Sequence, residues 1–187
     1  MSVGNLFARR HLWPTMEREW LGYGLAALVG LAVLAYVGLA SGALAPYLAG
    51  YDPANPGDYD HATVTVVDDG TGEELGTVDA AVADTFPKRY VGLSETDALP
   101  EDRGMLFVHD GVDERTYVMR NMSFGLDIVF VDADGRITAI YEAPEPRPDE
   151  NGAAREYTGE ARYVLEVNRG WTGARTIEEG DRLDFDL

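Results

Sequence analysis

The chain has 187 residues, no cysteine, and 33 acidic residues against 15 lysines and arginines, so its formal net charge is −18. The absence of cysteine excludes disulfides, thiolate nucleophiles and cysteine-ligated zinc, and the acidic balance argues against a nucleic-acid partner, which needs a basic face. The acidic residues are spread along the chain and Lys88 is the single lysine, a composition that indicates adaptation to high salt, where self-repulsion is screened.

A long uncharged segment follows residues 1–20. No charged residue lies between Glu19 and Asp52, and the stretch Leu21–Leu44 supplies the roughly 20 apolar residues that a membrane span needs. We therefore predict a single transmembrane helix over residues 21–45, through which the protein would be attached to the membrane.

The basic residues near this segment predict its orientation. Arg9, Arg10 and Arg18 precede it, and no lysine or arginine follows until Lys88. The positive-inside bias then places the N-terminus in the cytoplasm and the C-terminal domain on the extracytoplasmic side of the cell membrane.

Two alternatives concern the processing of this segment. The sequence Ala43–Ala45 resembles a signal-peptide cleavage site, although Pro46 follows it and the apolar run is longer than a usual signal core. The sequence RRHLW at Arg9–Trp13 resembles a twin-arginine export signal. The twin-arginine route would change the path of export more than the final side of the domain. Because of Pro46 and the length of the apolar run, we predict an uncleaved anchor.

A linker and the first half of a soluble domain come next. Residues 46–61 are rich in Pro, Gly, Asp and Asn, which is typical of an extended linker, and the domain is predicted over residues 62–187. Strands are expected at 62–68 and 75–84. A short helix is expected at 85–95, because Thr85 can cap it and Pro87 fits its first turn.

The rest of the domain also consists of short β-rich segments. Strands are expected at 104–109, 115–121, 126–132, 136–143, 161–168 and 182–187. Residues 110–114 are expected to separate the strand at 104–109 from the strand at 115–121. Gly135 suits a tight hairpin turn. Many short strands with turn signals predict a mainly β fold, a compact sandwich or partly open barrel with one or two short helices.

Four motifs carry a resemblance to a known family. They are RYVGLS, LPEDRGMLFVH, YVMRNMSFGLDIVFVDADGRI and RYVLEVNRGWTGARTIEEGDRL. Together they resemble the DUF192 (UPF0127) family over about Val78–Leu187. The resemblance implies a compact, mainly β domain that is often exported or membrane-tethered, and it implies no reaction. The chain departs from the family at Val118, where Trp is common, and at Gly125, where Pro is common.

The third motif places polar residues among large apolar ones. Asp127 shares a strand face with Val129 and Val131, and Asn121 follows Met119 on the same face, so both polar side chains are expected to be partly buried and hydrogen-bonded. They would either hold the hairpin together or line a pocket for a small polar ligand. The candidate ligand-binding residues are Arg89, Tyr117, Met119, Arg120, Asn121, Asp127, Glu166 and Trp171.

Metal and cofactor chemistry have little support in the sequence. Asp132 and Asp134 lie in DADG, but the ligands that complete an EF-hand loop are missing, so both are expected to be turn residues. The three histidines are widely separated, and His109 is expected to end its strand half-exposed without a partner nucleophile. We predict no metal, no cofactor and no nucleic-acid partner.

The predicted function is therefore a membrane-anchored extracytoplasmic domain that is not an enzyme and that binds a small ligand, a glycan or an envelope protein. One alternative is a cell-envelope hydrolase in which Asp127 pairs with Glu142 or Glu166 as acid and base. Another is a structural accessory subunit of an envelope complex.

Overall fold

The computed structural model describes residues 58–187. The predicted N-terminal segment, the predicted span at 21–45 and most of the predicted linker lie outside these residues. Within 58–187, no helix has the length and apolar character required to cross a membrane.

The described chain is mainly β, as predicted. Its strands are β1 (His61–Val67), β2 (Glu74–Ala83), β3 (Arg103–Val118), β4 (Leu126–Val131), β5 (Ile137–Ala143), β6 (Glu156–Asn168) and β7 (Arg182–Asp184). Its helices are short: α3 (Phe86–Val91), η1 (Gly152–Ala154) and η2 (Gly173–Arg175). Thr85 caps α3 and a proline lies in its first turn, as the sequence predicted.

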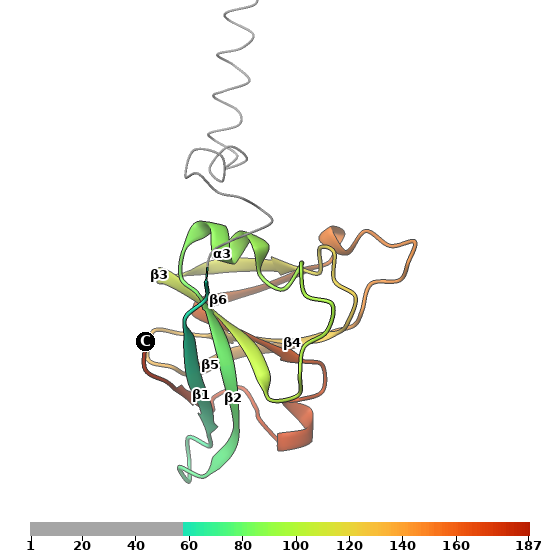
Figure 1. The fold of residues 1–187 in the computed structure, drawn as a ribbon. Coiled ribbons are helices and arrows are strands. Elements are labelled where there is room, and N and C mark those ends of the chain that lie inside the picture. Colours follow the sequence, from blue (N-terminus) through green and yellow to red (C-terminus); the bar gives the residue numbers. More distant parts are fainter. Residues whose placement is uncertain (1–57) are drawn as a thin grey trace, which may run out of the picture. The chain divides into compact units, whose positions relative to one another are not determined.

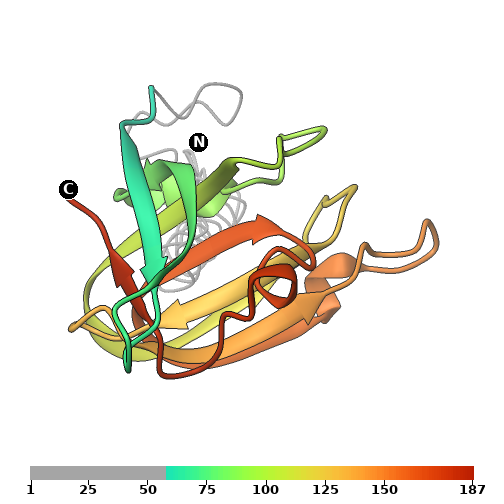
Figure 2. The ribbon, with the colours of Figure 1, turned by 90° about the horizontal axis from the view of Figure 1, so that it is seen from below.

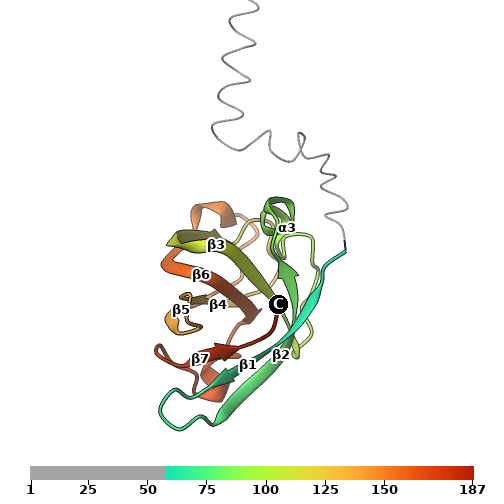
Figure 3. The ribbon, with the colours of Figure 1, turned by 90° about the vertical axis from the view of Figure 1, so that its left-hand side faces the viewer.

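All seven strands belong to one sheet with the order β5-β4-β6-β3-β2-β1-β7 (Figure 1; β7 is labelled in Figure 3). Neighbouring strands are antiparallel except β2 and β3, which are parallel. Parallel neighbours need a crossover connection, and the segment that contains α3 supplies it. This crossover places α3 across one face of the sheet.

The sheet curls until its two edge strands approach each other. Figures 2 and 3 show β1 and β2 standing opposite β4 and β5 across the curl. Arg136 forms an antiparallel bridge with Arg182, and the Leu183 amide donates to the Gly135 carbonyl at 2.8 Å. Gly135 has a φ of +83°, which glycine adopts without strain, so the β4–β5 turn can lie directly against β7. Of the two predicted architectures, the partly open barrel is the one found.

Both faces of the central strands are buried. Val129 and Leu165 belong to a first core, which also contains residues of β1 and β7, while Phe130 and Val164 belong to a second core on the opposite face. Because alternate side chains point to opposite faces, all six residues of β4 are buried. A polar side chain on β4 or β6 therefore enters apolar surroundings on whichever face it points to.

The predicted break at residues 110–114 was wrong. β3 is one strand of 16 residues, and its pairing with β6 shifts register between Val108 and Asp113. An inserted bulge of this kind bends the strand while hydrogen bonding resumes beyond it. Residues 110–114 therefore do interrupt the regular pairing, but they form a bulge within one strand and do not end it.

Asp127 is hydrogen-bonded and completely buried, whereas its apolar neighbours predicted partial burial. One carboxylate oxygen accepts from the Gly170 amide at 2.9 Å, and the other accepts from the Thr172 amide at 2.9 Å and the Thr172 hydroxyl at 2.6 Å. These partners lie in the loop after β6, so Asp127 holds that loop and not the β3–β4 connection. The loop in turn places Trp171, which is 3% exposed, in the first core.

Asn121 differs from its prediction. Its side chain is exposed, and its φ of 55° places it in the left-handed region, which asparagine tolerates better than most residues. β3 ends at Val118, so the strand alternation that predicted a buried Asn121 stops before it. Asn121 serves the turn through its backbone conformation.

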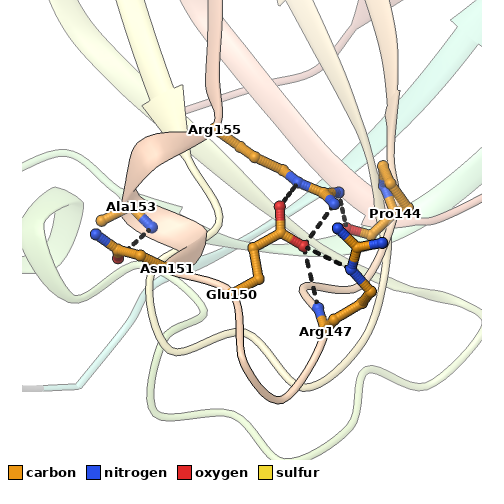
Figure 4. Close-up of polar contacts among 6 residues, drawn as sticks. All are labelled: Pro144, Arg147, Glu150, Asn151, Ala153 and Arg155. Carbon is orange, nitrogen blue, oxygen red and sulfur yellow. Dashed lines mark hydrogen bonds and ion pairs between the residues drawn. The ribbon is translucent and has the colours of Figure 1, made fainter.

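The loop between β5 and β6 is held by Glu150 (Figure 4). Its carboxylate accepts from Arg155 Nη2 at 2.6 Å, also contacts Arg155 Nε, and accepts from the Arg147 amide at 3.2 Å. The Asn151 side chain accepts from the Ala153 amide at 3.1 Å and starts η1. Next to it, Gly152 lies so close to the Met119 carbonyl that an added Cβ would be 2.1 Å from its oxygen. The loop is thus fastened against the end of β3.

We expect Asp127→Asn to lower the free energy of unfolding by roughly 1.5–3 kcal/mol, because the amide weakens three charge-assisted bonds and adds buried donors. Glu142→Gln is the matched control, since Glu142 lies directly across from Asp127 on β5 but is exposed, and its ion pair among residues 58–187 is with Arg169. Denaturant unfolding of both variants beside the parent measures the difference. Equal losses in the two variants would contradict the role given to Asp127.

Candidate functional site

A cavity of about 260 Å³ lies between α3, β3 from Phe107 to its end at Val118, and the turn that follows β3. We call it the α3–β3 cavity. Its apolar lining includes Leu93, Phe107, Met122 and Leu126, most of which belong to the second core or pack against it. Its polar lining combines groups from four parts of the chain. They are Arg89 of α3, His109, Arg115 and Tyr117 of β3, Arg120 of the turn, and Glu166 of β6.

Glu166 is the buried acid of this cavity. In the sheet it lies between Met105 of β3 and Ile128 of β4, and it is only 5% exposed. Burial raises the pKa of its carboxyl group to about 8. Within residues 58–187, no group forms a hydrogen bond or an ion pair with it. At neutral pH the carboxyl group is therefore protonated, and it can donate a hydrogen bond into the cavity.

His109 and Tyr117 form a neutral hydrogen-bonded pair. His109 Nε2 lies 3.0 Å from the Tyr117 hydroxyl, and the two rings meet edge to face. Burial, helped by Arg115 and Arg89, lowers the pKa of His109 to about 4, while burial, helped by Glu166, raises the pKa of Tyr117. Both groups are thus uncharged at neutral pH, so neither balances the charge of the arginines.

Three guanidinium groups are held at this cavity by main-chain carbonyls. Arg89 Nη1 donates to the Asp84 and Val108 carbonyls at 2.6 and 2.8 Å, and Arg115 Nη2 donates to the Gly111 carbonyl at 2.9 Å. Arg120 lies 4.3 Å from the centre of the Tyr90 ring and donates to the Tyr90 carbonyl.

Carbonyl partners orient these groups but do not neutralise them. Among the described ion pairs of 4 Å or less, only one involves the three arginines, the contact of Arg115 with the exposed Asp113 at 3.9 Å.

The charge of the cavity is opposite to that of the domain around it. Residues 58–187 contain 12 lysines and arginines against 30 acidic residues. The lining contains three arginines and a single acid, Glu166, which is neutral at pH 7. The acidic domain therefore surrounds a positively charged cavity, and such a local field favours an anion.

The proposed pair of catalytic carboxylates is not formed here. Asp127 and Val167 are partners in the sheet, and Ile128 and Glu166 are the next pair, so Asp127 and Glu166 point to opposite faces. Both oxygens of Asp127 are also occupied by the loop after β6. Glu142 lies on the Asp127 side and is exposed.

The structure brings together half of the predicted site residues. Arg89, Tyr117, Arg120 and Glu166 line the α3–β3 cavity. The others lie elsewhere: Met119 is fully buried in the second core, Asn121 is on an exposed turn, and Asp127 and Trp171 are buried at the loop after β6.

Sequence reasoning missed His109 and Arg115, which flank the bulge of β3. The predicted break at 110–114 separated them, whereas the bulge keeps both in one strand beside Tyr117. A usable signal was the return of β-branched and aromatic residues after the five residues DGVDE, which is also compatible with a bulged strand.

No group of three or more His, Cys, Asp or Glu side chains within 58–187 is arranged to hold a metal ion. Asp132 accepts the amides of Asp134 and Arg136 through one oxygen, at 2.8 and 2.9 Å. This is the turn geometry that the sequence indicated for DADG.

Residues 66–185 match the family model DUF192, described as Uncharacterized ACR. A candidate transcription regulator from Sinorhizobium meliloti is 24% identical in its crystal structure, with a TM-score of 0.62 over 69% of this chain and 96% of that chain. A protein of unknown function from Novosphingobium aromaticivorans is 27% identical, with a TM-score of 0.55 over 65% of this chain and 83% of that chain. The comparison with curated proteins gave no match. The first likeness shows the shared fold alone.

We expect the buried Glu166 to make stability fall as pH rises. The folded chain keeps the proton up to a pKa of about 8, whereas the unfolded chain loses it near 4.5. Between these values the folded state binds more protons, so the free energy of unfolding decreases, by up to about 5 kcal/mol. Glu166→Gln should remove this decrease in the free energy of unfolding.

Chemical denaturation of Glu166→Gln and the parent across this pH range measures the effect. The variant should gain stability relative to the parent as pH rises. Glu160→Gln, at an exposed position of the same strand, should follow the parent. A constant difference between Glu166→Gln and the parent at all pH values would show that folding does not raise the pKa of Glu166.

Proposed function

The chain belongs to the DUF192 family, and we propose that its β domain is a non-enzymatic module that binds a small ligand in the α3–β3 cavity. The single observation that carries this proposal is the set of preoriented polar groups around an apolar-walled cavity. Glu166 is buried without a hydrogen-bonding partner among the described residues, and three guanidiniums line the same cavity and are held by main-chain carbonyls. A ligand would supply the partner that the protein does not.

The dimensions of the cavity support a small molecule. Its volume of about 260 Å³ lies just below the roughly 300–1,000 Å³ that is usual for sites of drug-sized ligands. A glycan chain or a protein surface would contact a longer groove or a flatter face. Burying a carboxyl group without a partner also costs stability, and residues kept at such a cost are commonly functional.

The hydrolase alternative has less support. A glycosidase of the usual kind needs two carboxyl groups across one bond. Among the residues that the structure describes, Glu166 is the one acid in the cavity lining, and Asp127 points to the other face of the sheet. We therefore assign binding, not acid–base chemistry, to this cavity.

Ligand screening of the full-length chain at high salt tests the proposal. Val118→Trp places a bulky ring at the cavity lining, and Val112→Trp makes the same change on the same strand, at a residue outside the lining. We expect small molecules that raise the melting temperature of the parent to do the same for Val112→Trp and to lose their effect on Val118→Trp.

Two results would contradict the proposal. One is a complete absence of stabilising molecules for the parent. The other is equal stabilisation of both variants, which would place binding elsewhere, for example in the 580 Å³ cavity lined by Tyr59, Leu99 and Met105.

We further propose that the domain is anchored by the apolar run 21–45 and faces the extracytoplasmic side, because the three arginines at positions 9, 10 and 18 precede the run. The absence of cysteine allows a direct test by single-cysteine labelling. We expect Asp134→Cys, on the exposed β4–β5 turn, to react with a membrane-impermeant maleimide in intact cells. Ser2→Cys should react only after lysis. The opposite pattern would reverse the orientation.

A further inference from the structure

The chemical class of the ligand follows from the charges and donors of the α3–β3 cavity, and this inference rests on the proposed binding function. The groups that face Glu166 or share its cavity come from α3, β3 and the turn after it. They are Arg89, His109, Arg115, Tyr117 and Arg120. At neutral pH this set presents three positive charges and no negative charge, since Glu166, His109 and Tyr117 are all neutral.

We propose that the α3–β3 cavity binds a small organic anion with one negative charge, a carboxylate on an apolar body. The guanidiniums would face its anionic head, the protonated Glu166 would donate to it, and Phe107 and Leu126 would contact its body.

Both parts of such a ligand have matching surfaces in the structure. A guanidinium group suits the planar oxygens of a carboxylate, and the Arg115 guanidinium lines the cavity with Nη2 held by the Gly111 carbonyl. An aliphatic or aromatic body suits the second core, where Phe107 and Tyr117 meet edge to face with their ring centres 5.0 Å apart. An ion without an apolar body would leave this wall exposed to water.

A single negative charge fits the protein better than two. The three guanidiniums have already given one nitrogen each to main-chain carbonyls, so fewer donors remain for a larger anionic group.

Protonated Glu166 makes the binding sensitive to pH. Above about pH 8 its carboxyl group loses the proton, and a carboxylate then faces the anionic head of the ligand. Affinity should therefore fall as pH rises through this range, while the arginines keep their charge. Glu166→Gln keeps a neutral donor at this position and should remove the dependence.

Three probes of nearly equal shape test the charge class: benzoate, benzamide and benzamidine. Each is titrated calorimetrically into the full-length chain at one fixed high salt concentration. We expect benzoate to bind at least about tenfold more tightly than neutral benzamide, and the cation benzamidine not to bind. Equal binding of benzoate and benzamide would overturn the anion inference and leave the binding function standing. Failure of all three would count against both, and tighter binding of inorganic phosphate than of benzoate would overturn the organic anion.

A variant pair then locates the effect. Arg115→Gln should reduce the ratio of benzoate to benzamide affinity at least about fivefold, whereas Arg182→Gln, which removes the same charge from an exposed position of β7, should leave it unchanged. The ratio is the readout because a disturbed fold weakens the binding of both probes alike.

In the parent, benzoate affinity should fall at least about tenfold between roughly pH 7 and pH 9.5, and in Glu166→Gln it should stay constant. An unchanged ratio in Arg115→Gln, or the same pH profile in both proteins, would overturn the proposal.

Discussion

Burial of both faces of β4 and β6 is the constraint on which the rest of this structure depends. Because a first and a second core cover opposite faces of the same strands, a polar side chain there is largely removed from bulk water. It must find partners, lose its charge, or be supplied with a partner from outside. Asp127 and Glu166 are the two acids in these strands that meet this condition, and they meet it differently.

Asp127 is satisfied entirely within the chain. Three donors from Gly170 and Thr172 use both of its oxygens and fix the loop that carries Trp171 into the first core. Glu166 has no such partner and is neutral at pH 7. Two residues of the same chemical type, in neighbouring strands, thus divide between structure and candidate function according to the face to which they point. A buried acid whose oxygens are all hydrogen-bonded within the chain has a structural role. A buried acid that lacks such partners and lines a cavity can instead bind a ligand.

The bulge in β3 and the crossover through α3 together make the positive site in an acidic domain. The bulge keeps His109, Arg115 and Tyr117 in one continuous strand. The crossover brings Arg89 to the same cavity. Main-chain carbonyls hold the arginines, so the cluster keeps its charge while its geometry is fixed. In a domain with this excess of acids, most arginines would be expected to pair with carboxylates on the surface. Their concentration at one cavity is therefore informative about the ligand.

Local patterns determined a large part of the fold. β-branched runs, the cap and proline of α3, and the glycine of the β4–β5 turn depend on near neighbours, so the elements and the mainly β class could be predicted from the sequence. The burial of Asp127 also followed from strand alternation. The break at 110–114 and the burial of Asn121 were wrong, because a strand pattern does not show where pairing shifts register or ends.

The sequence by itself supplied Arg89, Tyr117, Arg120 and Glu166 as site candidates, together with four residues that lie elsewhere, and it predicted an anchor in residues that the structure does not describe. Only the tertiary structure decided which of these side chains meet. Register across β3, β6 and β4 separates Asp127 from Glu166, and the crossover brings Arg89 to residues of β3 and β6 far along the chain. Charge neutrality at Glu166 is likewise a tertiary property, since desolvation comes from residues brought together by folding and not from neighbours in the sequence.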